Sequence, residues 1–330
     1  MAEQNGRLAS VAGMRYRRLG DSGLAVSVVG LGCNSFGRRI DAVQVKAVVD
    51  AAVDAGITLF DTSDTYGDPA GASEELLGAA LKANGRRDDV VIATKFGKPV
   101  GGLNGNDFDA RGSRRYITRA VEASLRRLGT DYIDLYQQHE PDPSTPIAET
   151  LAALDDLVRA GKVRYLGSSN FASWQVADAA WTARTAHTTP FISAQNEYSL
   201  IERGVETELM PACQAYGVGL LPYFPLGNGL LTGRYRRDEI PAGSRLSHER
   251  YAPYLARAPW EIIEAVRGFA RERGLSMVDV AVGGLAARPT VGSVISGATS
   301  PEQVRVNAAA AAWVPTPEDL AELEAITTRR

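Results

Sequence analysis

The sequence has 330 residues, of which 45% are hydrophobic, and its 36 basic and 39 acidic residues leave a formal net charge of −3. This length can bury one large core or two ordinary ones. Both signs of charge are spread along the chain, so we expect no nucleic acid and no membrane among its partners. Two cysteines, Cys33 and Cys213, are too few for a disulfide framework, and no apolar run reaches the ~20 residues of a membrane span. These features predict a cytoplasmic protein.

The N-terminal part of the chain predicts a hairpin followed by a strand and a helix. Residues 1–13 have no apolar stretch long enough for a signal peptide, and we expect them to form a flexible extension. Two β-like segments, 14–19 and 24–29, flank a D-S-G turn, which is typical of a hairpin. An apolar strand at 28–32 and a helix at 42–55, with Asp41 as its N-cap, follow.

From residue 56 onward, short apolar strands alternate with amphipathic helices. The predicted strands cover 56–60, 90–94, 132–136, 163–167, 191–194, 218–222 and 291–295, and the predicted helices cover 73–83, 113–128, 145–160, 173–185, 204–216, 260–273, 277–287, a segment from Pro301, and 317–326. Two loops are long, one at 97–112 and one that runs to about residue 259.

Counted from Val28, the alternation makes eight strand–helix units, which is typical of a parallel sheet covered by helices. Eight units in this length predict a single domain over residues 1–330. The expected fold is α/β, a closed (β/α)8 TIM barrel with the N-terminal hairpin at its bottom and additional C-terminal helices. The alternative is an open doubly wound sheet that binds a dinucleotide through G-x-G-x-x-G. Residues 30–35 have only two of those glycines, with Ser35 in the third place.

Polar side chains follow almost every predicted strand, where the active site of such a barrel lies. They are Cys33 and Asn34, Asp61 and Tyr66, Lys95, His139, Ser169 and Asn170, Gln195, Tyr223, and the segment Gly297–Thr299. A buried lysine needs a partner or loses its proton, and Asp61 can be that partner for Lys95. A tyrosine beside this lysine would have its phenolate stabilised, which brings its proton within reach of chemistry.

Several motifs in this order resemble the aldo-keto reductase family, from the hairpin near Met14 to the helix after Pro301. They include Phe60-Asp61-Thr62-x-x-x-Tyr66-Gly67, Ala93-Thr94-Lys95, Gln138-His139-x-x-Asp142, Gly167-x-Ser169-Asn170-Phe171, Gln195-x-Glu197-Tyr198, Tyr223-x-Pro225-Leu226-Gly227, Gly229-Leu230-Leu231-Thr232-Gly233 and Gly297-Ala298-Thr299. The family has the barrel fold and reduces carbonyl compounds with a nicotinamide coenzyme.

The resemblance implies a catalytic quartet of Asp61, Tyr66, Lys95 and His139. Tyr66 would be the general acid, Lys95 held by Asp61 would lower the proton affinity of Tyr66, and His139 would orient the carbonyl group. The alternatives from the residues alone are a buried structural ion pair for Lys95 and Asp61, and a core histidine for His139.

The resemblance also implies positions for NADP(H). Ser169, Asn170 and Gln195 would hold the carboxamide, and Tyr223 would stack on the nicotinamide ring. Phe224, Pro225, Leu226 and Gly227 would line the pyrophosphate path, with Gly297, Ala298 and Thr299 before a helix N-terminus. Gln303 and Asn307 would face the adenine, and Cys33 and Asn34 complete the predicted coenzyme-binding set.

The residues expected at the 2′-phosphate differ from those of the animal reductases. Those enzymes have a lysine and an arginine where Gly297 and Gln303 stand here. A related branch instead supplies charge from the long loop after the seventh strand, where Arg234 and Arg245 lie. The resemblance therefore favours NADP(H). Asn34 occupies a place where many relatives have tryptophan, so we expect a roomier and more polar substrate pocket.

Three functions compete. The first is an NADP(H)-dependent carbonyl reductase or alcohol dehydrogenase with a small-molecule carbonyl or alcohol substrate. The second is a redox-sensing regulatory subunit similar to the potassium-channel β-subunits, in which asparagine stands at the position of His139. The third, a metal-dependent hydrolase, is disfavoured because the three histidines, His139, His187 and His248, have no metal-ligand spacing, so we expect no metal site. The sequence leaves the natural substrate and the oligomeric state open.

Overall fold

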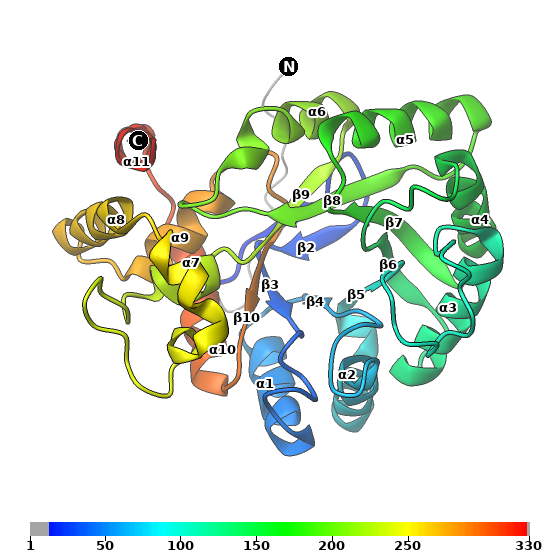
Figure 1. Cartoon of the computed structure of the whole chain (residues 1–330), viewed down its shortest axis with the longest axis horizontal. Helices are drawn as coiled ribbons and strands as arrows, with labels where there is room; N and C mark the ends of the chain where they lie inside the picture. The colour runs from blue at the N-terminus through cyan, green and yellow to red at the C-terminus, as the bar shows by residue number, and fades with distance from the viewer. Residues whose placement is uncertain (1–12, 329–330) are drawn as a thin grey trace.

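The computed structural model describes residues 13–328, and its central element is a closed barrel of eight parallel strands (Figure 1). The strands follow one another around the barrel in the order β10-β3-β4-β5-β6-β7-β8-β9. Their bounds are β3 Val29–Gly32, β4 Leu59–Asp61, β5 Val91–Phe96, β6 Ile133–Gln138, β7 Val163–Ser169, β8 Phe191–Glu197, β9 Gly219–Tyr223 and β10 Val294–Gly297. The predicted barrel is confirmed, and the open doubly wound sheet is wrong.

The register of the strands brings their polar ends together. Asp61, the last residue of β4, pairs with Ala93 of β5, and Lys95 two residues later pairs with Gln137 of β6. Because side chains of a strand alternate between the two faces, this spacing places Asp61 and Lys95 on neighbouring strands at the same end of the barrel.

Helices cover the outside of the barrel, and the predicted N-cap Asp41 is confirmed. Asp41 caps α1 with a reciprocal capping box to Gln44, and Gly129, at φ 62°, ends α3. The helix bounds are α1 Ala42–Asp54, α2 Ala72–Asn84, α3 Arg114–Leu128, α4 Ile147–Arg159, α5 Ser173–Ala186, α6 Leu209–Tyr216, α7 Ala252–Ala256, α8 Trp260–Glu272, α9 Met277–Ala286, α10 Pro301–Ala309 and α11 Pro317–Thr327. The short 3₁₀ turns are η1 Arg87–Asp89, η2 Gly204–Glu206, η3 Gly227–Thr232, η4 Arg245–Ser247, η5 Glu249–Tyr251 and η6 Ala310–Ala312.

The predicted hairpin, β1 (Tyr16–Arg18) and β2 (Ala25–Ser27), closes the N-terminal end of the barrel. Leu19 in its turn is fully buried and belongs to the apolar cluster inside the barrel, with Leu59, Leu135 and Leu221. The backbone N–H of Asp21 also donates to the carbonyl of Gly217, just before β9. One end of the barrel is therefore plugged, and the opposite end remains for a site.

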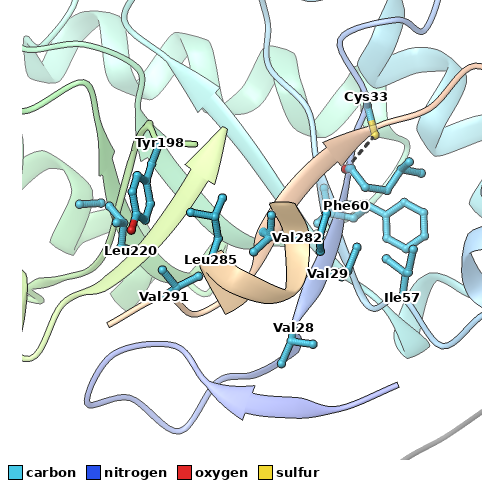
Figure 2. Close-up of a cluster of buried hydrophobic side chains, with 14 of the residues drawn as sticks. Val28, Val29, Cys33, Ile57, Phe60, Tyr198, Leu220, Val282, Leu285 and Val291 are labelled. Atoms are coloured by element: carbon cyan, nitrogen blue, oxygen red, sulfur yellow. Dashed lines mark hydrogen bonds between the residues drawn. The ribbon is translucent and has the colours of Figure 1, made fainter. Parts of the chain in front are cut away.

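The main core lies between the barrel and its helices. Figure 2 shows Val282 and Leu285 of α9 in the same buried cluster as Leu220 of β9 and Val29 of β3. These side chains are all at most 1% exposed. The additional helices α8 and α11 pack on each other (Figure 1), and Ile263 of α8 and Leu323 of α11 extend this core.

Three details differ from the expectations. The predicted helix 204–216 is a 3₁₀ turn followed by α6, and the connection after β9 contains η3, η4, η5 and α7. The last strand begins at Val294, because Val291 makes only an isolated bridge to Leu220. Of the predicted extension 1–13, residues 1–12 lie outside the described part. Within residues 13–328, no helix has the length and apolarity needed to cross a membrane.

Candidate active site

A cavity of about 840 Å³ opens at the C-terminal ends of the barrel strands. Its volume lies within the range of small-molecule sites. Most of the polar strand-end residues predicted from the sequence line it, namely Asn34, Asp61, Tyr66, His139, Ser169, Asn170, Gln195, Tyr223, Gly297, Ala298 and Thr299. The barrel therefore gathers residues from seven strand ends around one space.

Lys95 does not itself line this cavity; it is fully buried and contacts Asp61 and Tyr66, which do. Its Nζ donates to Asp61 Oδ2 at 2.7 Å, to the carbonyl of Thr62 at 2.9 Å and to Tyr66 Oη at 3.2 Å. The three ammonium protons thus have three acceptors, which offsets the cost of burying the charge. Asp61, Lys95 and Tyr66 form one connected group.

The pKa values of this group follow from its environment. Burial disfavours the Lys95 ammonium, but attraction to Asp61 and bonds to Asp61 and Tyr66 outweigh burial, so the pKa of Lys95 lies above its ordinary value. For Tyr66, burial raises the pKa more than the charge of Lys95 lowers it. Tyr66 is therefore a protonated phenol at neutral pH, and the nearby ammonium stabilises the phenolate that forms when the proton leaves.

His139 follows β6 and faces the same cavity. Its backbone N–H donates to the carbonyl of Phe96, and its Nδ1 lies 3.1 Å from Ser63 Oγ. Its ring packs edge-on against the ring of Tyr66, with 5.9 Å between the centroids. Burial, with the positive charges of Lys95 and Lys98, lowers the pKa of His139 to about 2, so the imidazole is neutral near pH 7.

Two residues that the motifs did not single out complete this end of the site. Gln137 Nε2 donates to Asp61 Oδ1 at 3.2 Å, beside Gln195 Nε2 at 2.8 Å. Ser63 contacts His139, as described above. Gln137 lies in the polar run Gln137-Gln138-His139 at the end of β6, and Ser63 in the polar run after β4. A search of whole strand-end runs rather than of single motif positions would have found both.

Ser169, Asn170 and Tyr223 form a second connected group beside His139. Asn170 Nδ2 donates to the carbonyl of His139 at 2.9 Å, and Tyr223 Oη donates to Asn170 Oδ1 at 2.9 Å. Ser169 Oγ donates to the carbonyl of Gln195 at 2.9 Å. Asn170 has φ 59°, in the left-handed region that asparagine tolerates better than most residues. These contacts fix the orientation of the Asn170 amide and of the half-buried Tyr223 ring.

The connection after β9 brings further residues to the cavity. Phe224, Pro225 and Leu226 line it, and Phe224 has φ 53°, a strained value for a bulky residue. Arg245 lines it from η4, where it donates to Asn228 Oδ1 and Tyr251 Oη, both at 3.0 Å. Arg234 also lines the cavity but is exposed, and no side-chain bond to a residue within 13–328 holds it.

At the end of β10, Gly297, Ala298 and Thr299 lead into α10, which Ser300 caps. Gln303 Oε1 accepts from the N–H and the hydroxyl of Thr299, and Asn307 Nδ2 donates to the carbonyl of Gly297 at 3.3 Å. Both Gln303 and Asn307 line the cavity. They therefore lie at the end of the cavity formed by the α10 N-terminus.

Two predicted coenzyme-binding residues do not line the cavity. Cys33 is fully buried, with its Sγ directed to the carbonyl of Leu31, as Figure 2 shows. Gly227 is buried within η3, close to Ile201. Cys33 instead supports the site through its backbone, because its N–H donates to the backbone carbonyl of Asp61 and its own carbonyl accepts from the Ser73 hydroxyl.

Among residues 13–328, no group of three or more His, Cys, Asp or Glu side chains is arranged to hold a metal ion. The sequence profile described as "Aldo/keto reductase family" matches residues 28–328.

Relatives cover nearly the whole length. The chain is 36% identical to a "Probable voltage-gated potassium channel subunit beta" of Oryza sativa subsp. japonica, over 95% of this chain and 96% of the relative. It is 37% identical to "Uncharacterized oxidoreductase YrpG" of Bacillus subtilis (strain 168), over 88% and 89%. It is 37% identical to "Probable aldo-keto reductase 1" of Glycine max, over 80% and 75%. The family profile and these relatives cover most of the sequence, and the structure has the closed barrel. The chain therefore belongs to the aldo/keto reductase family, a family of oxidoreductases.

Proposed function

We propose that this protein is an NADP(H)-dependent oxidoreductase that reduces an aldehyde or ketone to the alcohol, with Tyr66 as the general acid. The contact of Lys95 Nζ with both Asp61 and Tyr66 Oη carries this proposal. A cation held by a carboxylate beside a phenol stabilises the phenolate, which is the product of proton donation. The cavity presents Tyr66 and neutral His139 side by side to a carbonyl oxygen.

In this proposal, Tyr66 gives its proton to the carbonyl oxygen, and Lys95 stabilises the tyrosinate that remains. His139 donates a hydrogen bond to the same oxygen while negative charge develops on it. Asp61 is held by Lys95, Gln137 and Gln195, so it keeps the ammonium aimed at Tyr66. The nicotinamide coenzyme supplies the hydride when it is bound.

The residues of the cavity fit such a coenzyme. Ser296 Oγ, at the end of β10, is buried in the cavity lining and has no hydrogen-bond partner within residues 13–328. The Tyr223 ring offers a flat surface for the nicotinamide, with Asn170 and Gln195 beside it for the carboxamide. The N-terminus of α10 lines the cavity through Ser300, Glu302 and Gln303, and the positive end of the helix dipole suits a phosphate. Pro301 has no N–H, and the N–H of Gln303 already donates to Ser300.

Arg245 supports NADP(H) over NAD(H). Its guanidinium is held by Asn228 and Tyr251 and lies over the rings of Phe224 and Tyr251. A fixed guanidinium is suited to a phosphate. Gly297 and Gln303 carry no charge, so the selectivity depends on Arg245 and Arg234 in the connection after β9.

Part of the cavity lining supports a polar substrate. Asn34, Ser35, Thr65 and Lys98 line the cavity, and none of these is a large apolar side chain. We propose a small hydrophilic carbonyl compound rather than an extended apolar one.

The test is a panel of aldehydes, ketones and sugars, followed by the absorbance of NADPH, with NADH in parallel. We expect consumption of NADPH with at least one polar carbonyl compound and slower consumption of NADH. No consumption with any member of a broad panel would refute the proposed reaction.

A second function, that of a coenzyme-binding regulatory subunit, is favoured by the 36% identity to the potassium-channel relative. His139 argues for the enzyme, because a neutral imidazole at this position can donate to a carbonyl oxygen. Gel filtration separates the two functions. A regulatory subunit would keep its coenzyme through the column and turn over slowly, whereas the enzyme would release it and turn over rapidly.

A further inference from the structure

A buried chain of hydrogen bonds runs from His139 away from the cavity. His139 Nδ1 lies 3.1 Å from Ser63 Oγ, which lies 3.3 Å from Asp64 Oδ1. Ser63 and Asp64 are fully buried, and His139 is 5% exposed. The other ring nitrogen, Nε2, makes no hydrogen bond within residues 13–328, and the ring lines the cavity. The only nitrogen left for a substrate is therefore Nε2.

The direction of the hydrogen bonds in this series decides whether Nε2 donates or accepts. His139 is neutral, so one ring nitrogen carries the proton and the other accepts. Ser63 has a single hydroxyl proton, and its oxygen already accepts from the N–H of Thr65 at 3.2 Å. The Thr65 hydroxyl, 3.0 Å from Ser63 Oγ, is a further neighbour that can donate or accept. If Ser63 donates to Nδ1, the ring proton is on Nε2 and can bond a carbonyl oxygen. If Nδ1 donates to Ser63, Nε2 has no proton and can only accept a hydrogen bond.

We propose that Ser63 and Asp64 are positioning residues that set the tautomer of His139: protonated Asp64 donates to Ser63, Ser63 donates to Nδ1, and the ring proton stays on Nε2. This inference rests on the proposed function in one respect, the need for an N–H directed at the carbonyl oxygen. When Asp64 loses its proton, the direction of these hydrogen bonds reverses: Nδ1–H donates to Ser63, and Ser63 donates to the Asp64 carboxylate.

The loop between β5 and α3 fixes which oxygen of Asp64 carries the proton. Asn104, on this loop, is 4% exposed, and its Oδ1 lies 3.3 Å from Arg127 Nη1. Arginine only donates, so the oxygen of the Asn104 amide must face Arg127 and its nitrogen must face Asp64. Asn104 Nδ2 donates to Asp64 Oδ2 at 2.8 Å. The proton of Asp64 therefore belongs on Oδ1, the atom that faces Ser63.

The surroundings of Asp64 favour its protonated form. The charged and titratable groups that act on it are buried Glu74 of α2, Arg127 and Tyr116 of α3, and Tyr136 of β6. Arg127 is engaged by Glu74 at 2.6 Å. Burial and then the charge of Glu74 raise the pKa of Asp64 to about 8, against the opposing effects of Arg127, Asn104 and Ser63. Asp64 thus holds its proton at neutral pH and releases it in mildly alkaline solution.

The tautomer can be read directly by NMR of the full chain labelled with ¹⁵N-histidine. The protein has three histidines, and a His139→Asn variant identifies the signal of His139. We expect the Nε2–H tautomer at pH 6.5 and a change to Nδ1–H above about pH 8. In Ser63→Ala, the pH dependence of this signal should disappear. An unchanged tautomer between pH 6.5 and 9.5 in the wild type, or the same change in Ser63→Ala, would overturn the proposal.

Activity provides a second readout. In Asp64→Asn, the amide oxygen faces the Asn104 donor, so the amide nitrogen faces Ser63 and holds the chain in its productive direction at every pH. We expect the wild-type kcat for carbonyl reduction to fall above about pH 8, while Asp64→Asn keeps its kcat to pH 9.5. Ser63→Ala should lower kcat at pH 7 by about fivefold, the equivalent of one hydrogen bond, with little change in KM.

Ser73→Ala is the matched control, because it also removes a fully buried hydroxyl, one that contacts Thr62 and the carbonyl of Cys33 but not His139. Its pH profile should equal that of the wild type. A profile of Asp64→Asn that falls as the wild-type profile does would contradict the inference. Absence of any carbonyl reduction by the wild type would refute the proposed function instead, and the NMR result would still decide the tautomer.

Discussion

Asp61, Lys95 and His139 are 2%, 0% and 5% exposed, and each sits within or directly after a barrel strand. Arg234 and Arg245 lie at the same cavity but on the connection after β9, where Arg234 is exposed and Arg245 half-buried. The strand register fixes the first group, whereas bonds to Asn228 and Tyr251 hold Arg245. The proposed proton chemistry thus lies on residues fixed by the barrel strands, and the proposed coenzyme selectivity lies on a segment whose shape depends on a few local contacts.

The largest effect should come from Tyr66→Phe. This change removes only the proposed proton donor, so the rate of carbonyl reduction should fall by about 10³-fold. Coenzyme affinity, measured by fluorescence titration, should be unchanged because the ring remains. A variant that reduces carbonyl compounds at the wild-type rate would exclude Tyr66 as the acid. The proposed proton chemistry could then not be assigned to the strand-end residues.

Asp61→Asn tests whether the strand-end group is also structural. The change leaves the buried Lys95 ammonium without its carboxylate, and we expect the free energy of unfolding to fall by about 3 kcal/mol. Lys46→Gln is the control, because it breaks an exposed ion pair with Asp50 and should cost less than about 1 kcal/mol. Urea denaturation measures both, and equal losses would show that burial of the Asp61 pair contributes nothing.

His139 should make stability depend on pH. Its pKa is about 2 in the folded protein and ~6.5 when unfolded, so the unfolded chain binds a proton between these values and the folded protein does not. Stability from this residue is therefore present above ~6.5 and declines as the pH falls. Between pH 7 and pH 5 the wild type should lose about 2 kcal/mol more than His139→Asn in urea denaturation. Equal losses in the two proteins would place a charged, solvated imidazole at this position.

Arg245→Ala should weaken NADPH binding about tenfold and NADH binding much less, because only NADPH has the 2′-phosphate. Arg234→Ala is the comparison, and its smaller effect is expected from its exposed position. Titration of each variant with both coenzymes measures the difference. Equal losses of NADPH and NADH in Arg245→Ala would remove this arginine from the phosphate site.

Metal chelation should have the smallest effect. The proposed reaction uses Tyr66, Lys95 and His139 and needs no metal ion, so exhaustive dialysis against a chelator should leave carbonyl reduction unchanged. Loss of activity that is restored by one added metal would contradict the proposed metal-free reduction.

The fold and the strand-end residues could be predicted because their causes are local in the sequence. Apolar runs such as Val90–Ala93 end in a polar residue, and the alternation with helices determines that these ends meet. The prediction therefore placed Asp61, Lys95 and His139 on the cavity side of the barrel, where the structure has them.

The connection after β9 and the partners of His139 could not be predicted in the same way. The left-handed backbone of Phe224 and the contact of Arg245 with Tyr251 depend on tertiary packing that no periodicity encodes. Cys33 was expected at the coenzyme, but its side chain points to the carbonyl of Leu31 inside the core. Asn104 reaches Asp64 only because the loop between β5 and α3 folds back over the end of β4, which joins segments 40 residues apart.

Closure of the sheet has a consequence for how the protein behaves in concentrated solution. Each of the eight barrel strands has a neighbour on both sides, since β10 pairs with both β3 and β9. The barrel therefore has no free edge strand, and a second molecule cannot extend this sheet by adding a strand to it. We expect aggregation during heating to begin only after the barrel opens, so turbidity should follow the loss of tertiary structure and not precede it.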